Sequence, residues 1–160
     1  MVEQAKPQTA KQQRQNSEQK RGKWAWDDIQ EVQKADSSSE KSLEKEYRSL
    51  ARGLNAMIQI NGLGQTLGFL KAKGKGDPKK AHFLLLKHLT EWMRDPDHFK
   101  APNSEVMKKG WDGLLQWVVD EGTSSADYRR ATTECMAFGT WLRRFAEAEL
   151  KAPEGEGETQ

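Results

Sequence analysis

Apolar residues recur three and four positions apart along most of the chain, which is the period of an amphipathic helix. One apolar stripe runs from Leu43 to Ile58 and another from Tyr128 to Phe145. Similar stripes occupy residues 81–92 and 106–118, and a first helical pattern begins near Gln13. No run of four or more residues alternates clearly between apolar and polar side chains, and β-branched residues are scarce. The pattern predicts an all-α fold, a single-domain bundle of five or six helices joined by short connections.

Local signals indicate where three of these helices begin. Ser37 and Glu40 have the spacing of a capping box, which predicts a helix start directly after Ser37. Asp77 followed by Pro78 predicts another start, because a proline at the first helical position loses no hydrogen bond. Ser124 is a predicted N-cap residue and indicates a helix start before the last apolar stripe.

The glycine-rich stretch INGLGQTLGFL, residues 60–70, resembles a phosphate-binding loop at first sight. A G-x-G-x-x-G fingerprint would need glycine where the chain has Leu67, and the preceding residues are helical in pattern instead of strand-like. We therefore expect a kink or break in the helix between Gly53 and Gly64. Gly64 and Gly68 would share one helix face and leave it bare for a close neighbour.

Composition and charge fit one intracellular domain of 160 residues. The formal net charge is only +2, although residues 1–23 carry four more basic than acidic side chains and residues 152–160 carry three acidic ones. We expect a disordered basic tail over residues 1–12, a helical domain over 13–151 and a disordered acidic tail over 152–160. Any nucleic-acid contact must be a local patch, because the body of the chain is nearly neutral.

A single cysteine, Cys135, excludes an intrachain disulfide and a cysteine-based zinc site. The first residues lack the apolar segment of a secretory signal, and no apolar run approaches the ~18 residues that a membrane span requires. These features predict a soluble cytoplasmic protein.

No catalytic constellation is visible in the sequence. His82 and His88 are six positions apart on one predicted helix, and His98 lies in a turn beside Asp95 and Asp97. We interpret His88 as a core residue, and the two aspartates as ordinary turn residues. The sequence therefore predicts a protein that is not an enzyme and that binds no metal or cofactor.

Basic residues beside small or aromatic ones are the remaining candidates for function. Such side chains can neutralise phosphates, and neighbouring rings can stack on exposed bases. A solvated helix face carries similar charges, so each pair alone is weak evidence. The candidate phosphate contacts are Lys71, Lys73, Arg143 and Arg144, followed by Arg52, Lys108 and Lys109.

Three segments together resemble one family. They are Tyr47–Gly74, Ala126–Leu150 and Glu18–Trp26. The chain looks like the small α-helical subunit of the Cmr complex, the type III-B CRISPR effector that targets RNA. The resemblance covers most of residues 13–151, and its most specific pieces are the Ile-x-x-Asn-Gly-Leu core at residues 58–63 and the terminal TWLRRFAEAEL. Family members often have proline where this chain has Asn55 or Ala56, which leaves the end of that helix open.

The resemblance implies a non-catalytic subunit for antiviral defence. Its copies would stack inside the complex beside the backbone subunits that carry the guide RNA, and basic surface residues would help to hold the guide–target RNA duplex. RNA cleavage would belong to the backbone subunits and other activities to the large subunit. The residues alone also allow a helical protein–protein adaptor without nucleic-acid contact, with exposed tryptophans as its anchors.

Overall fold

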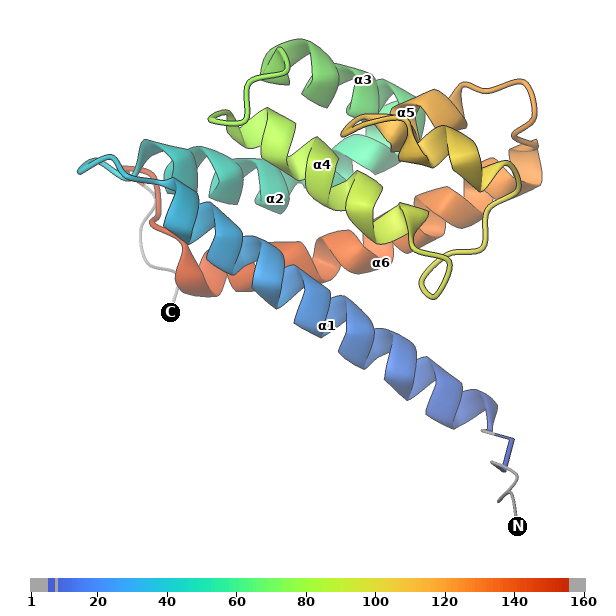
Figure 1. Cartoon of the computed structure of the whole chain (residues 1–160). Coiled ribbons are helices and arrows are strands. Elements are labelled where there is room, and N and C mark those ends of the chain that lie inside the picture. Colours follow the sequence, from blue (N-terminus) through green and yellow to red (C-terminus); the bar gives the residue numbers. More distant parts are fainter. Residues whose placement is uncertain (1–5, 8, 156–160) are drawn as a thin grey trace.

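Helices account for nearly all regular structure in the computed structural model, which describes residues 6–7 and 9–155 (Figure 1). Within that part of the chain no strand occurs, so the predicted all-α single-domain bundle is confirmed. Six α-helices and one short 3₁₀ helix follow one another as α1 (Ala10–Ala35), α2 (Ser42–Asn61), α3 (Leu63–Gly74), α4 (Ala81–Arg94), η1 (Ser104–Lys108), α5 (Gly113–Val118) and α6 (Ser125–Glu149). No helix among the described residues is long and apolar enough to cross a membrane.

The two tails predicted to be disordered are described only in part. Residues 1–5, 8 and 156–160 lie outside the described residues. Helix α1 begins at Ala10, inside the segment expected to be the basic tail and before the predicted start near Gln13. After α6 ends at Glu149, residues 150–155 form no helix.

Helices α2 and α4 lie in the middle of the bundle (Figure 1). Helix α6 packs along α2 and α1, whereas α3 packs on α4 and α2, and α5 packs on α4 and α3. The N-terminal half of α1 extends beyond the other helices (Figure 1). Side chains of α3 and the C-terminal half of α6 are consequently presented on different sides of α2 and α4.

Stacked aromatic rings form the centre of the core. Trp92 of α4 stacks on Phe138 of α6, with ring centroids 4.7 Å apart and planes 7° from parallel. His98, which follows α4, stacks on the other face of Trp92 at 3.6 Å. Trp92 is 2% exposed and Phe138 is fully buried. Burial of each such ring contributes about 1.5–3 kcal/mol, so this stack fixes α4 against α6.

The predicted helix break lies at Gly62, between α2 and α3. Its backbone has φ 83° and ψ 162°, a conformation that is essentially reserved for glycine. The Gly62 N–H still donates to the Ile58 carbonyl at 2.8 Å, which closes α2. Leu63, Leu67 and Leu70 then face the core and are fully buried, as a break at this point requires.

Of the two α3 glycines that were expected to leave a bare face, Gly64 and Gly68, one meets a close neighbour. The Gly64 N–H donates to the Tyr128 hydroxyl at 2.9 Å, and a Cβ at Gly64 would lie 3.4 Å from Val118. A Cβ at Gly68 would have no atom within 4 Å. The expected close approach is therefore confirmed at Gly64 and absent at Gly68 within the described chain.

The predicted start of α2 was wrong, because a side chain outside the local motif caps it. The helix begins at Ser42 instead of directly after Ser37. Asp36 performs the capping: one of its carboxylate oxygens accepts the Glu44 N–H and the other accepts the Ser38 N–H, both at 3.0 Å. The buried carboxylate thus pairs with a backbone donor in the first turn of α2.

The other two predicted starts had different outcomes. Helix α4 begins at Ala81, three residues after Pro78, because the Asp77 side chain closes a turn by accepting the Lys79 N–H at 3.0 Å. The predicted cap of α6 is confirmed, since the Ser124 hydroxyl oxygen accepts the Asp127 N–H at 3.1 Å.

Candidate nucleic-acid interface

Two of the seven candidate residues converge on one carboxylate. Arg52 of α2 and Arg143 of α6 both approach Oε1 of Glu147, with their Nε atoms at 3.3 and 3.0 Å. The side chains of Arg52 and Arg143 are 37% and 52% exposed. The ion pairs thus bring two guanidinium groups from different helices to one carboxylate at a partly exposed surface, and guanidinium groups are well suited to donate hydrogen bonds to phosphate oxygens.

More basic side chains lie near this pair. Arg144 is exposed on α6, next to Arg143. Arg48, one turn before Arg52, lines a surface hollow together with Glu147 and Lys151. We call Arg48, Arg52, Arg143 and Arg144 the arginine group. Glu44 and Glu149 also line the hollow, so its floor carries both signs of charge.

Lys71 is occupied by an internal ion pair. Its Nζ lies 2.6 Å from Oδ2 of Asp112, which directly precedes α5. The other Asp112 oxygen accepts from Gln116 at 2.9 Å. Burial acts to raise the pKa of the Asp112 carboxyl, but the hydrogen bonds from Lys71 and Gln116 outweigh it and hold the pKa below its usual value. Because Asp112 offsets the charge of Lys71, this ammonium group attracts a phosphate less strongly than an unpaired lysine would.

Lys73 lies at the exposed end of α3, near the start of α4. Burial lowers the pKa of His82, Glu46 opposes that shift, and the positive charges of Lys73 and Lys80 add to it. Lys73 and Lys80 therefore both act electrostatically on the start of α4. They form a second, smaller basic region.

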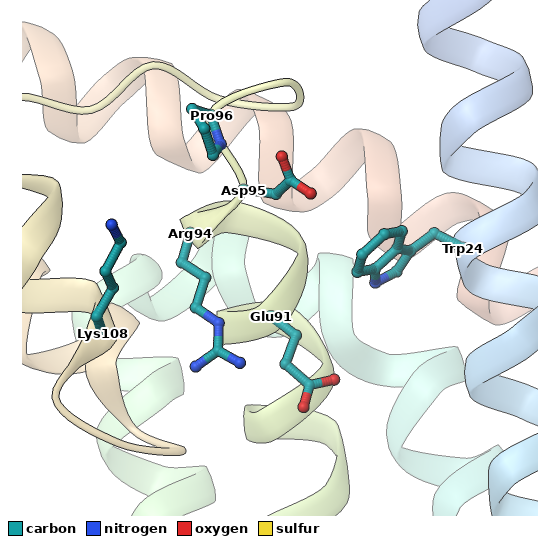
Figure 2. A pocket seen from close by; sticks show the side chains of 6 residues that line it. All are labelled: Trp24, Glu91, Arg94, Asp95, Pro96 and Lys108. Carbon is teal, nitrogen blue, oxygen red and sulfur yellow. The ribbon is translucent and has the colours of Figure 1, made fainter.

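Lys108 and Lys109 are exposed at the end of η1. Lys108 borders an open surface hollow with Trp24 and Arg94 (Figure 2). Figure 2 shows Lys108 and Arg94 on one side of the hollow and the Trp24 ring of α1 on the other. Glu91 and Asp95 also line it, so the hollow has no uniform charge.

Most aromatic rings beside the candidate basic residues are used inside the fold. Trp141 donates to Glu18 at 3.2 Å and lies against Gly22 of α1. The Tyr128 hydroxyl is bound by Gly64. Trp111 packs on Phe83, with ring centroids 4.4 Å apart. Stacking of these rings on nucleic-acid bases, which the sequence suggested, would compete with these packing contacts.

The seven candidates do not form one continuous strip. The structure brings Arg52 together with Arg143, although they belong to different segments of the sequence, and Arg144 directly follows Arg143 on α6. Lys71 and Lys73 lie on α3, which packs on the side of α2 and α4 away from the C-terminal half of α6 (Figure 1). Among the seven, Arg52 and Arg143 are therefore the pair that the ion pairs of the described residues draw together across two helices.

A buried polar cluster was missed by the sequence interpretation. Asp28 and Glu31 of α1 and His88 of α4 place one ligand atom each within 4.8 Å of one another, and no other His/Cys/Asp/Glu trio does so in the described chain. Burial raises the pKa of Asp28 to about 7, although His88 opposes that shift. A hydrogen bond with His88 lowers the pKa of Glu31 to about 2. The signal for this cluster in the sequence was the pair of acidic residues one turn apart, beside the apolar stripe of α1.

The bundle matches a known family over most of its length. The family described as CRISPR-associated protein (Cas_Cmr5) matches residues 17–149. This range begins within α1 and ends at the last residue of α6, so it contains every later helix and the arginine group.

Proposed function

Because the chain belongs to the Cas_Cmr5 family, the small-subunit family of the type III-B CRISPR Cmr complex, we propose that it is a non-catalytic structural subunit that contacts the guide–target RNA. Membership of the family makes the other Cmr subunits its partners. In the proposed arrangement, copies of the chain stack along the complex beside the backbone subunits. The basic surface of each copy neutralises RNA phosphates, and the assembly acts in antiviral defence.

The observation that carries the RNA contact is the convergence of Arg52 and Arg143 on Glu147. The Arg143 side chain is 52% exposed, and its planar guanidinium can bind phosphate oxygens in a two-pronged manner. Arg144 adds a further exposed charge beside the pair. Contacts of this kind hold the backbone of RNA without reading its sequence.

The remaining candidates have a lower rank within this proposal. Lys73, Lys108 and Lys109 are exposed and would add phosphate contacts on other surfaces. Lys71 ranks below them because Asp112 already offsets its positive charge.

The experiment is crosslinking of guide and target RNA in the assembled Cmr complex, followed by identification of the crosslinked peptides of this chain. We expect crosslinks in the peptides that contain Arg52, Arg143 and Arg144. Crosslinks confined to other subunits would contradict the proposed RNA contact and leave family membership unaffected.

A second function, a protein–protein adaptor without RNA contact, is favoured by two exposed apolar residues. Ile60 is 81% exposed at the end of α2, and Val119 is 70% exposed after α5. A partner subunit that covered either side chain would remove its apolar surface from water, which favours association. The same crosslinking experiment separates the two functions, because an adaptor would crosslink to protein subunits and not to RNA.

A further inference from the structure

Three potential metal ligands meet between α1 and α4. Asp28 and Glu31 are one turn apart on α1, so their carboxylates project from the same face. His88 of α4 is fully buried opposite them. Its Nε2 lies 3.3 Å from Oε2 of Glu31 and 3.9 Å from Oδ1 of Asp28.

These separations are close to those of ligands around one small ion. Tetrahedral Zn²⁺ with bonds of about 2.0–2.2 Å to nitrogen and oxygen places its ligand atoms about 3.3–3.5 Å apart. The pair formed by His88 and Glu31 already has this spacing, and Asp28 needs to move closer to His88 by about half an ångström. The Asp28 and Glu31 ligand atoms, which lie within 4.8 Å of one another, would also move closer together around the ion.

A second observation points to a missing ligand in the cluster. The Asp28 side chain is 8% exposed, and its Oδ2 has no hydrogen-bond partner. A buried carboxylate oxygen without a partner is costly, and native structures rarely keep one without a bound ion or water. The unpartnered oxygen belongs to the carboxylate that faces His88.

The groups around the cluster are suited to hold such ligands. The Tyr47 hydroxyl lies 2.7 Å from Nδ1 of His88, which orients the ring and leaves Nε2 toward the two carboxylates. Lys87 donates to Oε1 of Glu31 at 2.8 Å and leaves Oε2 toward His88. Metal-bound histidines and carboxylates usually have outer partners of this kind.

We propose that Asp28, Glu31 and His88 form a binding site for one divalent first-row transition-metal ion, with Zn²⁺ as the best fit. One imidazole and two carboxylates suit this class of ion, and two negative charges match its charge of two. Water would fill the fourth position on the side of Glu31, whose side chain is 41% exposed. The ion would fasten α1 to α4 and so stabilise the long first helix on the bundle.

Zinc titration of the full-length, tag-free chain tests the site. After treatment with EDTA and dialysis, Zn²⁺ at about 100 times its dissociation constant should raise the melting temperature by about 5–10 °C. Mass spectrometry under native conditions should find one ion per chain. Co²⁺ in place of Zn²⁺ should give the visible absorption of a low-symmetry site, which the hydrated ion lacks. No thermal shift with either ion would overturn the proposal.

Matched variants separate this site from binding elsewhere. Glu31→Gln and Asp28→Asn should abolish the thermal shift, and Glu31→Gln is expected to fold because its side chain is partly exposed. Glu46→Gln is the control, since Glu46 pairs with a different histidine, His82, at 3.3 Å. A full shift in both cluster variants, or an equal loss in the control, would contradict the assignment.

Discussion

Arg21 of α1 and Glu134 of α6 form a two-pronged ion pair, with Nε–Oε1 and Nη2–Oε2 distances of 2.9 and 2.7 Å. Their side chains are only 17% and 14% exposed. Oε1 of Glu134 also accepts the indole N–H of Trp92 at 3.0 Å, so one carboxylate links α1, α4 and α6. Arg21 lies near the middle of α1, so the pair fixes this part of the helix to the bundle.

Replacement of Arg21 by methionine should destabilise the fold markedly. Arg21→Met keeps much of the apolar stem but leaves Glu134 mostly buried with one lost partner. We expect the free energy of unfolding to fall by about 2–3 kcal/mol, as measured by urea denaturation. Lys23→Met is the control, because the Lys23–Asp27 pair on the same helix is 74% and 58% exposed and should contribute about 0.5 kcal/mol or less. Equal losses in the two variants would contradict this role of Arg21.

The double variant Arg143→Ala, Arg144→Ala should weaken RNA binding by the assembled complex several-fold. Each phosphate contact removed should reduce the slope of log affinity against log salt by about 1, so the double variant should reduce it by about 2. Filter binding across a salt series measures both quantities. Arg129→Ala, Arg130→Ala is a charge-matched control on the same helix, about 20 Å away along its axis. An unchanged slope in the first variant, or the same loss in both, would refute the assignment.

Glu147→Gln should have the opposite effect on RNA binding. The substitution keeps the shape of the side chain but removes the charge that Arg52 and Arg143 share. Their guanidinium groups would then be freer to bind phosphate, so we expect tighter RNA binding and a steeper salt dependence. Stability should change by less than about 1 kcal/mol, because the three side chains are a third to a half exposed. Glu121→Gln, an exposed change of equal charge before α6, should leave RNA affinity unaltered.

The helical periodicity could be predicted because it is local, and so could the break at Gly62 and the cap at Ser124. The start of α2 could not, because Asp36 caps it from a position eight residues before Glu44. The segment after Asn103, predicted as one helix, is split into η1 and α5, and the two elements pack closely on each other. A Cβ at Gly113 would lie 1.9 Å from the Met107 carbonyl oxygen, so η1 folds tightly against the start of α5.

The sequence was sufficient to predict that candidate side chains are exposed, but it was not sufficient to predict their ion-pair partners. Lys73, Arg143 and Arg144 are exposed, as polar positions on amphipathic helices should be. The partners of Lys71 and Arg52 lie in distant parts of the sequence, and spacing along the chain does not reveal them. The same holds for the metal cluster, in which His88 is 57 residues from Glu31. Which partner a buried polar side chain finds depends on how the helices pack against one another.

Asp36→Asn should reduce stability at neutral pH and not in strong acid. Burial acts to raise the pKa of Asp36, but hydrogen bonds from the Glu44 N–H and from Ser38 outweigh it and lower the pKa. A lowered pKa in the folded state stabilises the protein above the unfolded value near 3.9, and this stabilisation is lost as pH falls through the folded pKa. We expect a loss of about 1 kcal/mol at pH 7 and nearly equal stability of the two proteins at a pH below the folded pKa of Asp36. Urea denaturation at both pH values measures this, and a constant difference would contradict it.

Gly62→Ala and Gly53→Ala should change stability in opposite directions, because the two glycines have different backbone requirements. Gly62 has φ 83° and ψ 162°, where a Cβ is strained, so alanine should cost about 1–3 kcal/mol. Gly53 lies inside α2, and a Cβ there would meet no atom within 4 Å. Alanine at Gly53 should therefore stabilise the chain by about 0.5–1 kcal/mol through helix propensity and a smaller loss of entropy. Thermal melts of both variants measure the two effects. A stable Gly62→Ala protein would mean that α2 and α3 can join as one helix, and that the break does not set the direction of Lys71 and Lys73.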